Sequence, residues 1–142
     1  SSDLGNSITP ILGINTGHLG FLADVSPANI DTTIEAFLNG YYTIEERSLL
    51  SVESTQNLSV YPYALNEVAI LKFDNSALIQ VTAEVDGNLL TSYLADGLII
   101  CTPTGSTGYS LSVNGPIISP YSKTFCIAPI APHSLNIRPV IV

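Results

Sequence analysis

The sequence predicts a mainly β fold of the β-sandwich type, with one helix near the start. Apolar and polar residues alternate over residues 79–86, which is the pattern of a half-buried antiparallel strand. The turn-forming residues Asp86-Gly87-Asn88 end this stretch and predict a β-hairpin. Further short apolar runs recur between turn residues, as they do in sandwiches. The chain has 142 residues, enough for one modest core, so a second domain would be a fragment.

Two elements are predicted before residue 41. Pro10–Asn15 is a short apolar run that enters a glycine-rich turn, and it predicts a buried strand. Ser26 and Pro27 have the residue types of a helix N-cap and a first helical residue, and Gly40 ends the periodic pattern. The apolar residues of this stretch share one helical face: Ile30, Ile34, Phe37 and Leu38. The pattern predicts a helix from Pro27 to Asn39.

Short runs rich in β-branched and aromatic residues predict the other strands. Besides residues 79–86, they are Tyr42–Glu46, Leu49–Ser54, Leu65–Lys72, Leu89–Tyr93, Leu98–Thr102 and Phe125–Ala128. The stretch Thr102–Pro120 is rich in Ser, Thr, Gly and Pro, and we predict that it is the functional loop.

The charge balance of the chain excludes some functions. Its formal net charge is −8 and it has only four Lys and Arg residues, so it lacks the basic footprint of a nucleic-acid-binding protein. A bound phosphate would have to be neutralised by backbone N–H groups and a metal ion. Charged residues make up 11% of the chain, below the roughly 25% usual for soluble domains. Part of the surface is therefore expected to meet a partner, either a missing domain or another copy of the chain.

The cysteines, the histidines and the start of the chain carry no signature of a metal site or of export. Cys101 and Cys126 lack metal-ligand spacing and a disulfide pattern, so we expect two reduced, buried thiols. His18 and His133 lie far apart in the sequence, which favours local hydrogen bonding over a ligand or base role. Neither a secretory signal nor an apolar stretch of membrane-spanning length is present. These features predict a cytoplasmic protein that does not enter a membrane.

One stretch combines a strand with a loop suited to binding an anion. Asp96-Gly97 leads into an apolar run that ends in the glycine- and hydroxyl-rich segment Thr102–Ser110. Such a turn presents backbone N–H groups to a phosphate or a base edge. It lacks the lysine of a Walker A loop, and the residues around Ser106 do not form a nucleophile elbow. An ordinary strand-to-helix loop is the alternative, and for Asp96 a ligand contact is favoured over a role as general base.

A polar pair, Asn66-Glu67, lies within an apolar strand. Adjacent strand residues point to opposite faces, so at least one of the two faces the core side unless the strand bulges. A buried carboxylate needs a donor, and a ligand hydroxyl can supply one. An edge strand with the pair in water is the alternative.

Taken in order, four segments resemble the NAD kinase family. They are Gly13–Leu22 (GINTGHLGFL), Leu65–Val68 (LNEV), Asp96–Ser110 (DGLIICTPTGSTGYS), and Pro132–Leu135 (PHSL) with Arg138-Pro139. The resemblance covers nearly the whole chain. It implies an N-terminal α/β domain, which in this family holds a Gly-Gly-Asp-Gly motif, and a C-terminal β-sandwich domain that supplies most of the NAD site. Residues 1–22 would be the end of the first domain, and residues 23–142 would form the second, truncated at its C-terminal end.

The resemblance also implies an activity. Enzymes of this family are kinases that transfer a phosphoryl group from ATP, or from polyphosphate in some bacterial members, to the 2′-hydroxyl of the adenosine ribose of NAD. They use a divalent metal such as Mg²⁺, and the aspartate of the Gly-Gly-Asp-Gly motif is taken as the base. That motif is absent from this sequence, so we expect no catalytic residue in the chain and no activity from it alone. The residues do not choose between ATP and polyphosphate, or between NAD and NADH.

The resemblance further implies a set of substrate-binding residues. Asn66 and Glu67 would contact the adenosine half of NAD, and Asp96 the ribose or nicotinamide side. The residues around the adenine and the phosphates would be Thr104, Thr107, Gly108, Tyr109 and Ser112. Phe21 would line the pocket, while Ala128 and Ile130 would reach it from a neighbouring copy in a dimer or tetramer.

Departures from the family pattern leave two other interpretations open. Gly108 and Ala95 replace the Ala and Gly common in the family, and Asn114-Gly115 replaces a glycine pair, although none of these changes removes a side chain that the mechanism needs. A non-catalytic, regulatory nucleotide-binding module could use the same sandwich. A lipid or sphingoid-base kinase shares the overall architecture, but the complete Asn66-Glu67 and Thr102–Ser110 motifs argue against it.

Overall fold

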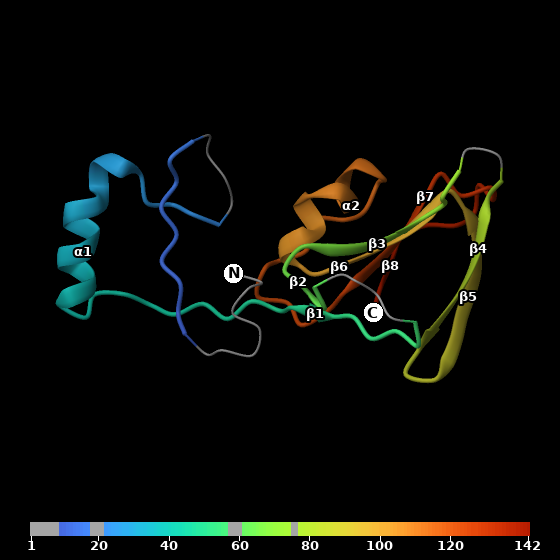
Figure 1. The fold of residues 1–142 in the computed structure, drawn as a ribbon, viewed down its shortest axis with the longest axis horizontal. Coiled ribbons are helices and arrows are strands. Elements are labelled where there is room, and N and C mark those ends of the chain that lie inside the picture. Colours follow the sequence, from blue (N-terminus) through green and yellow to red (C-terminus); the bar gives the residue numbers. More distant parts are fainter. Residues whose placement is uncertain (1–8, 18–21, 57–60, 75–76) are drawn as a thin grey trace. The chain divides into compact units, whose positions relative to one another are not determined.

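The computed structural model describes residues 9–17, 22–56, 61–74 and 77–142 (Figure 1). The chain divides into two compact units, residues 3–46 and residues 47–142. In the described part of the chain, the first unit carries the longest helix and the second carries all the named strands. Among these residues, no helix is both long and apolar enough to cross a membrane. The domain boundary expected after Leu22 stays a prediction.

The helix expected at Pro27–Asn39 is confirmed. A 3₁₀ turn, η2 (Pro27–Asn29), leads into α1 (Ile30–Leu38), and Gly40 follows in the left-handed region at φ 77°. Proline suits the first helical position, where its missing N–H is not needed. Ser26 has the extended conformation of an N-cap, but its side chain makes no capping hydrogen bond. Pro27 and Gly40, rather than the serine hydroxyl, therefore account for the limits of this helix.

The apolar face of α1 is largely exposed. Ile34, Phe37 and Leu38 are 47%, 50% and 77% exposed. Phe37 contacts the ring of Tyr42, with centroids 5.0 Å apart. Among the described residues of this first unit, none is fully buried.

Two strands predicted in the first unit are wrong. Pro10–Asn15 contributes a single parallel bridge, between Ile14 and Val25. Tyr42–Glu46 forms no strand. The residue types suited a strand in both places, but a strand also needs a neighbour whose ladder it can join.

The described residues of the second unit form antiparallel strands in three sheets. The largest has the order β3-β6-β7-β8, and the others are the β4-β5 hairpin and the short β1-β2 pair. The bounds are β1 (Leu50–Ser51), β2 (Tyr63–Ala64), β3 (Glu67–Leu71), β4 (Ile79–Val85), β5 (Asn88–Ala95), β6 (Gly97–Cys101), β7 (Cys126–Ile130) and β8 (Val140–Ile141). The predicted mainly β fold of the sandwich type is confirmed.

The hairpin predicted around residue 86 forms as expected. β4 and β5 pair from Ile79 opposite Ala95 to Val85 opposite Asn88. Asp86 and Gly87 both have positive φ, 50° and 76°. Positive φ at both central residues is the mark of a type I′ turn, whose twist matches that of the strands it joins.

Strand β6 lies at the centre of the core because both of its faces are covered. One cluster lies between the hairpin and the sheet and contains Tyr93, Leu98 and Ile127. A second lies on the other face and contains Ile99, Cys101, Ile118, Cys126 and Ala128. Successive side chains of a strand point to opposite faces, which explains why Leu98 and Ile99 join different clusters. The hairpin and the loop after β6 thus lie on opposite faces of the sheet (Figure 1).

Several strand limits differ from the predicted ones. β1 covers only part of Leu49–Ser54, and β5 extends beyond Leu89–Tyr93 on both sides. β3 begins at Glu67 instead of Leu65, because the carbonyls of Leu65 and Asn66 accept hydrogen bonds from Thr102 outside the strand ladder. The short strands β2 and β8 were not predicted, since two residues are too few to show an alternating pattern.

Candidate functional site

The candidate site lies where β3 begins and β6 ends. Glu67, the first residue of β3, is paired with Cys101, the last residue of β6. The segment Thr102–Ser110 leaves the sheet at this point and forms η3 (Thr104–Thr107) and the start of the short helix α2 (Tyr109–Ser112). The sheet topology therefore brings together the two motifs that the sequence singled out, the Asn66-Glu67 pair and this loop.

Thr102 joins the two motifs through hydrogen bonds. Its backbone N–H donates to Asn66 O at 2.8 Å, and its side-chain Oγ1 donates to Leu65 O at 2.5 Å. The same Oγ1 accepts a hydrogen bond from the backbone N–H of Gly105 at 3.0 Å. The side chain is fully buried, so these bonds form away from water and strengthen one another.

The turn packs so closely on the polar pair that it requires glycine. A Cβ added to Gly105 would lie 2.1 Å from the carbonyl oxygen of Asn66, so a larger residue would displace backbone. A Cβ added to Gly108 would lie 3.2 Å from Glu67 Oε2. The turn therefore lies directly against the Glu67 carboxylate.

Glu67 has the clearest electrostatic signal in the site. Its Oε2 is buried and has no hydrogen-bond partner among the described residues. Burial raises the pKa of the Glu67 carboxyl above its ordinary value, because the charged form loses hydration. Buried polar atoms are nearly always hydrogen-bonded in folded proteins. Glu67 Oε2 therefore lacks a hydrogen-bond donor within the described chain, whereas the adjacent Asn66 is exposed.

The other predicted loop residues follow the polar pair in η3 and α2. Thr107 Oγ1 donates to Thr104 O at 3.4 Å, and Ser112 Oγ donates to Tyr109 O at 2.7 Å. The Tyr109 side chain is 41% exposed. No Lys or Arg occurs between residues 102 and 112. The loop thus presents hydroxyls, glycine backbone and one aromatic ring, and it has no side-chain cation.

Two other predicted residues, Asp96 and Ile130, lie at the opposite end of β6. The backbone N–H of Asp96 donates to Ile130 O at 2.9 Å, and its carboxylate pairs with Lys72 Nζ at 2.7 Å. The length of β6, at about 3.3 Å per residue, places Asp96 roughly 17 Å from Cys101 and from the Glu67 that pairs with it. Within one copy of the chain, Asp96 and Glu67 therefore cannot contact the same group of a ligand.

The predicted ligand contacts are all untested, those of Ala128, Ile130 and Phe21 among them. Ala128 is fully buried in the second core cluster, and Ile130 is half-buried at the end of β7. Phe21 lies outside the described residues, as does His18. His133 is exposed, and its backbone N–H donates to Leu94 O at 2.8 Å. The contributions of Ala128, Ile130 and Phe21 stay predictions.

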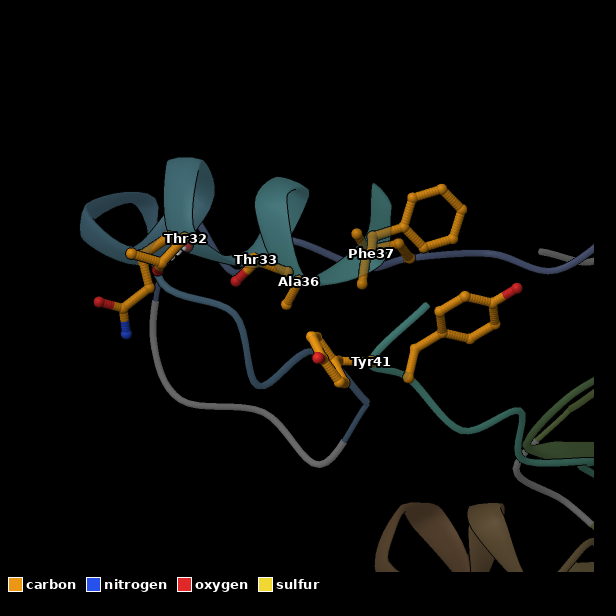
Figure 2. A pocket seen from close by; sticks show the side chains of 8 residues that line it. Thr32, Thr33, Ala36, Phe37 and Tyr41 are labelled. Carbon is orange, nitrogen blue, oxygen red and sulfur yellow. Dashed lines mark hydrogen bonds between the residues drawn. The ribbon is translucent and has the colours of Figure 1, made fainter. Parts of the chain in front are cut away.

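A hollow of about 440 Å³ lies in the first unit and is shown in Figure 2. Thr32, Thr33, Ala36 and Phe37 of α1 line it together with Tyr41 (Figure 2). None of its lining residues is charged, and none belongs to the predicted site. The hollow therefore offers no carboxylate, imidazole or amine, although the phenol hydroxyls of Tyr41 and Tyr42 belong to residues that line it.

A metal centre is not formed by the described residues. They contain no group of three or more His, Cys, Asp or Glu side chains that could hold a metal ion. Cys101 and Cys126 are free and buried, as predicted. Burial raises the pKa of the Cys126 thiol to about 11, which keeps it protonated and a poor ligand at neutral pH. The donor set of this part of the chain thus does not fit a divalent metal held by protein groups alone.

Sequence reasoning missed the residues that shape the loop from within. They are Thr102, Gly105 and Ser106. Ser106 is fully buried, donates to Pro103 O at 2.7 Å, and accepts from the backbone N–H of Ile118 at 3.0 Å. A hydroxyl directly after an apolar strand, with glycine three residues later, is a signal for Thr102 and Gly105, but it recurs in many loops.

Comparison with known families identifies both parts of the chain. Residues 65–142 match the model of the ATP-NAD kinase C-terminal domain. Residues 1–42 match the model of the ATP-NAD kinase N-terminal domain. The first match contains Asn66, Glu67 and the whole loop after β6.

Curated relatives agree with these matches. The NAD kinase of Bacteroides fragilis is 59% identical over 140 residues, and that of Porphyromonas gingivalis is 52% identical over 139 residues. Each alignment covers 98% of this chain and 48% of the relative. The chain thus spans about half the length of the curated relatives it matches.

Solved structures with a similar fold carry related names. The yeast NADH kinase complexed with NADH has a TM-score of 0.88 and 32% sequence identity, with 99% of this chain and 42% of that chain covered. An NAD kinase from Archaeoglobus fulgidus in complex with ATP has a TM-score of 0.76 and 35% identity, with 94% of this chain and 51% of that chain covered.

Proposed function

Since the chain belongs to the ATP-NAD kinase family, we propose that it supplies the NAD-binding part of an NAD kinase. The reaction transfers a phosphoryl group from ATP or polyphosphate to the 2′-hydroxyl of the adenosine ribose of NAD and yields NADP. One observation carries the proposal: the buried Oε2 of Glu67 has no hydrogen-bond partner among the described residues and lies beside Gly108 of the turn. The similar solved structures hold NADH and ATP, which supports a nucleotide as the substrate class.

The polar pair binds the adenosine half in this proposal. Glu67 accepts a hydrogen bond from a ribose hydroxyl, and the exposed amide of Asn66 can both donate and accept. The loop residues around the adenine and the phosphates are Thr104, Thr107, Gly108, Tyr109 and Ser112. Because this loop has no Lys or Arg, its backbone N–H groups meet the phosphate charge.

A neighbouring copy completes the site. Asp96 and Ile130 lie together at the far end of β6, roughly 17 Å from Cys101, too far to share one ligand group with Glu67. In this proposal Glu67 binds the adenosine half and Asp96 the ribose or nicotinamide side, whereas Ala128 and Ile130 come from the neighbouring copy. We therefore expect a dimer or tetramer. Sedimentation that shows only monomer at micromolar concentration contradicts this part of the proposal.

The base and the divalent metal lie outside this part of the enzyme. The described residues do not form a protein-held metal site, so no step is assigned to a metal bound by them. Their contribution is to bind and orient NAD, which lowers the barrier by placing the 2′-hydroxyl for attack. The free, buried cysteines support a reducing compartment, and we place the enzyme in the cytoplasm.

The proposal separates binding from chemistry, and one pair of measurements tests both. NAD titration by calorimetry is expected to show binding to the full-length protein and to residues 1–142. A coupled assay with ATP or polyphosphate and Mg²⁺ is expected to detect NADP with the full-length protein only, because general base catalysis contributes about 10²–10⁴-fold.

Two outcomes would contradict this assignment. NADP formation by pure residues 1–142 above background would place the base within the chain, and Asp96 would be the first residue to substitute. Full-length protein that binds a lipid substrate or NADP but does not phosphorylate NAD would favour a lipid kinase or a regulatory module.

A further inference from the structure

We propose that Thr102 is a positioning residue for NAD, an inference that rests on the proposed function. The Thr102 hydroxyl sets the distance between the Asn66-Glu67 pair and the turn at Thr104–Gly108. The Thr102 side chain is fully buried, so it acts through the residues it holds and not by touching the ligand. The sequence had indicated only that Thr102 opens the functional loop.

The Thr102 hydroxyl bonds to one segment of each motif. Oγ1 donates to Leu65 O at 2.5 Å, directly before the polar pair, and accepts from Gly105 N–H at 3.0 Å, within η3. A hydroxyl can donate and accept at the same time, whereas a methyl group of the same size can do neither. Without it, both backbone groups lose a partner in a place that excludes water.

The contacts beside this hydroxyl leave little freedom. A Cβ on Gly105 would lie 2.1 Å from Asn66 O, and one on Gly108 would lie 3.2 Å from Glu67 Oε2. The turn and the polar pair are thus already in contact, and a small movement of η3 changes the space beside the carboxylate. Displacements of about 1 Å are enough to weaken binding and catalysis strongly.

Ser106 offers a matched control in the same turn. Its hydroxyl is also fully buried and also donates and accepts, to Pro103 O at 2.7 Å and from Ile118 N–H at 3.0 Å. These bonds lead away from the Asn66-Glu67 pair. Removal of the Ser106 hydroxyl should therefore destabilise the turn without changing its distance from Glu67.

The test compares Thr102→Val, Thr102→Ser and Ser106→Ala in the full-length protein. Thr102→Val is expected to raise the KM for NAD, and the Kd from calorimetry, about tenfold. Thr102→Ser restores the hydroxyl and should stay within about twofold of the wild type. Ser106→Ala should lower the Tm and raise the KM for NAD by less than Thr102→Val does. Partial unfolding reduces kcat but not KM. A rise in the KM for NAD without a fall in kcat therefore identifies a positioning role for Thr102.

Hydrogen exchange gives a readout that does not require NAD. Thr102→Val should accelerate amide exchange in the peptide around Asn66 and Glu67, and Ser106→Ala should not. If Thr102→Val does not fold, Thr102→Cys, whose thiol is a weaker donor and acceptor, should show a smaller rise in the KM for NAD.

Each result decides the proposal. Either a wild-type KM for NAD or wild-type exchange around Asn66 and Glu67 in Thr102→Val, or in Thr102→Cys if valine does not fold, overturns it. An equal rise in KM from Ser106→Ala also overturns it. If the wild-type protein does not bind NAD, the proposed function fails, and the exchange pattern alone decides whether Thr102 holds the pair against the turn.

Discussion

Glu67 and Asp96 are carboxylates at opposite ends of the paired strands β3 and β6, and their surroundings differ. Asp96 has the ammonium group of Lys72 at 2.7 Å. Glu67 has an oxygen that is buried without a partner among the described residues, and burial raises the pKa of its carboxyl. The charge of Asp96 is compensated by Lys72 of the same chain, whereas Glu67 Oε2 has no hydrogen-bond donor among the described residues.

The difference shows how a carboxylate without a partner differs from one whose charge is already paired. A buried acceptor without a donor destabilises the free protein, because it has lost water and gained nothing in return. A ligand hydroxyl that supplies the missing bond recovers that loss, so binding is favoured at Glu67 in particular. At Asp96 the nearby Lys72 already offsets the charge, and a ligand would have to compete with it.

The largest expected effect is the loss of NAD affinity in Glu67→Ala. Removal of a hydrogen bond to a charged group costs about 1.5–3 kcal/mol, which corresponds to at least about a tenfold rise in Kd. Calorimetric titration of the full-length protein measures it, with Glu84→Ala on the exposed side of β4 as the control. Unchanged affinity in Glu67→Ala, or an equal loss in Asp96→Ala, would remove the distinction between the two ends.

A smaller effect is expected for Tyr109→Ala at the Glu67 end. Aromatic contact contributes about 0.5–1.5 kcal/mol, so NAD affinity should fall several-fold. The side chain is 41% exposed, and the Tm should change little. Tyr109→Phe keeps the ring and removes the hydroxyl, so it distinguishes their contributions to NAD affinity. A lower Tm with unchanged NAD affinity would instead assign Tyr109 to the core.

The pH dependence of stability should show the effect of burying the Glu67 carboxyl. Because burial raises the pKa of Glu67 in the folded protein, folding favours the protonated carboxyl. The stabilisation from this group is full below the pKa of the unfolded chain and is lost as the pH rises through the higher folded pKa. Glu67→Gln stays neutral, so it should raise the Tm relative to wild type at pH 7 and narrow that gap at pH 4, while NAD binding weakens. Thermal melts at both pH values measure this, and a lower Tm for Glu67→Gln at pH 7 would contradict it.

The smallest effect is expected at the other end of β6. Lys72 and Asp96 are partly exposed, and such ion pairs contribute about 0.2–1 kcal/mol. A double-mutant cycle with Lys72→Met and Asp96→Asn, measured by urea denaturation, should return a coupling in this range that shrinks at high salt. A coupling that salt does not change would show that the pair is more deeply desolvated than its exposure indicates.

Elements that depend on neighbouring residues were predictable. Pro27 and Gly40 mark the helix, and Asp86-Gly87 marks the hairpin, because the allowed backbone conformations of these residues act within a few positions. Strands that depend on partners far away in the sequence were harder to predict. Tyr42–Glu46 has suitable residues but joins no sheet of the described chain, and β8 is too short to leave a pattern.

The sequence by itself determined the mainly β class, the hairpin, the helix and the motifs Asn66-Glu67 and Thr102–Ser110, through residue type, alternation and ordered resemblance. Only the tertiary structure decided that these motifs touch while Asp96 lies at the far end of β6. Thr102 and Leu65 are 37 positions apart, and the bond between them depends on how β3 pairs with β6. Whether a carboxylate is compensated or left without a partner likewise depends on distances in space, which no spacing along the chain records.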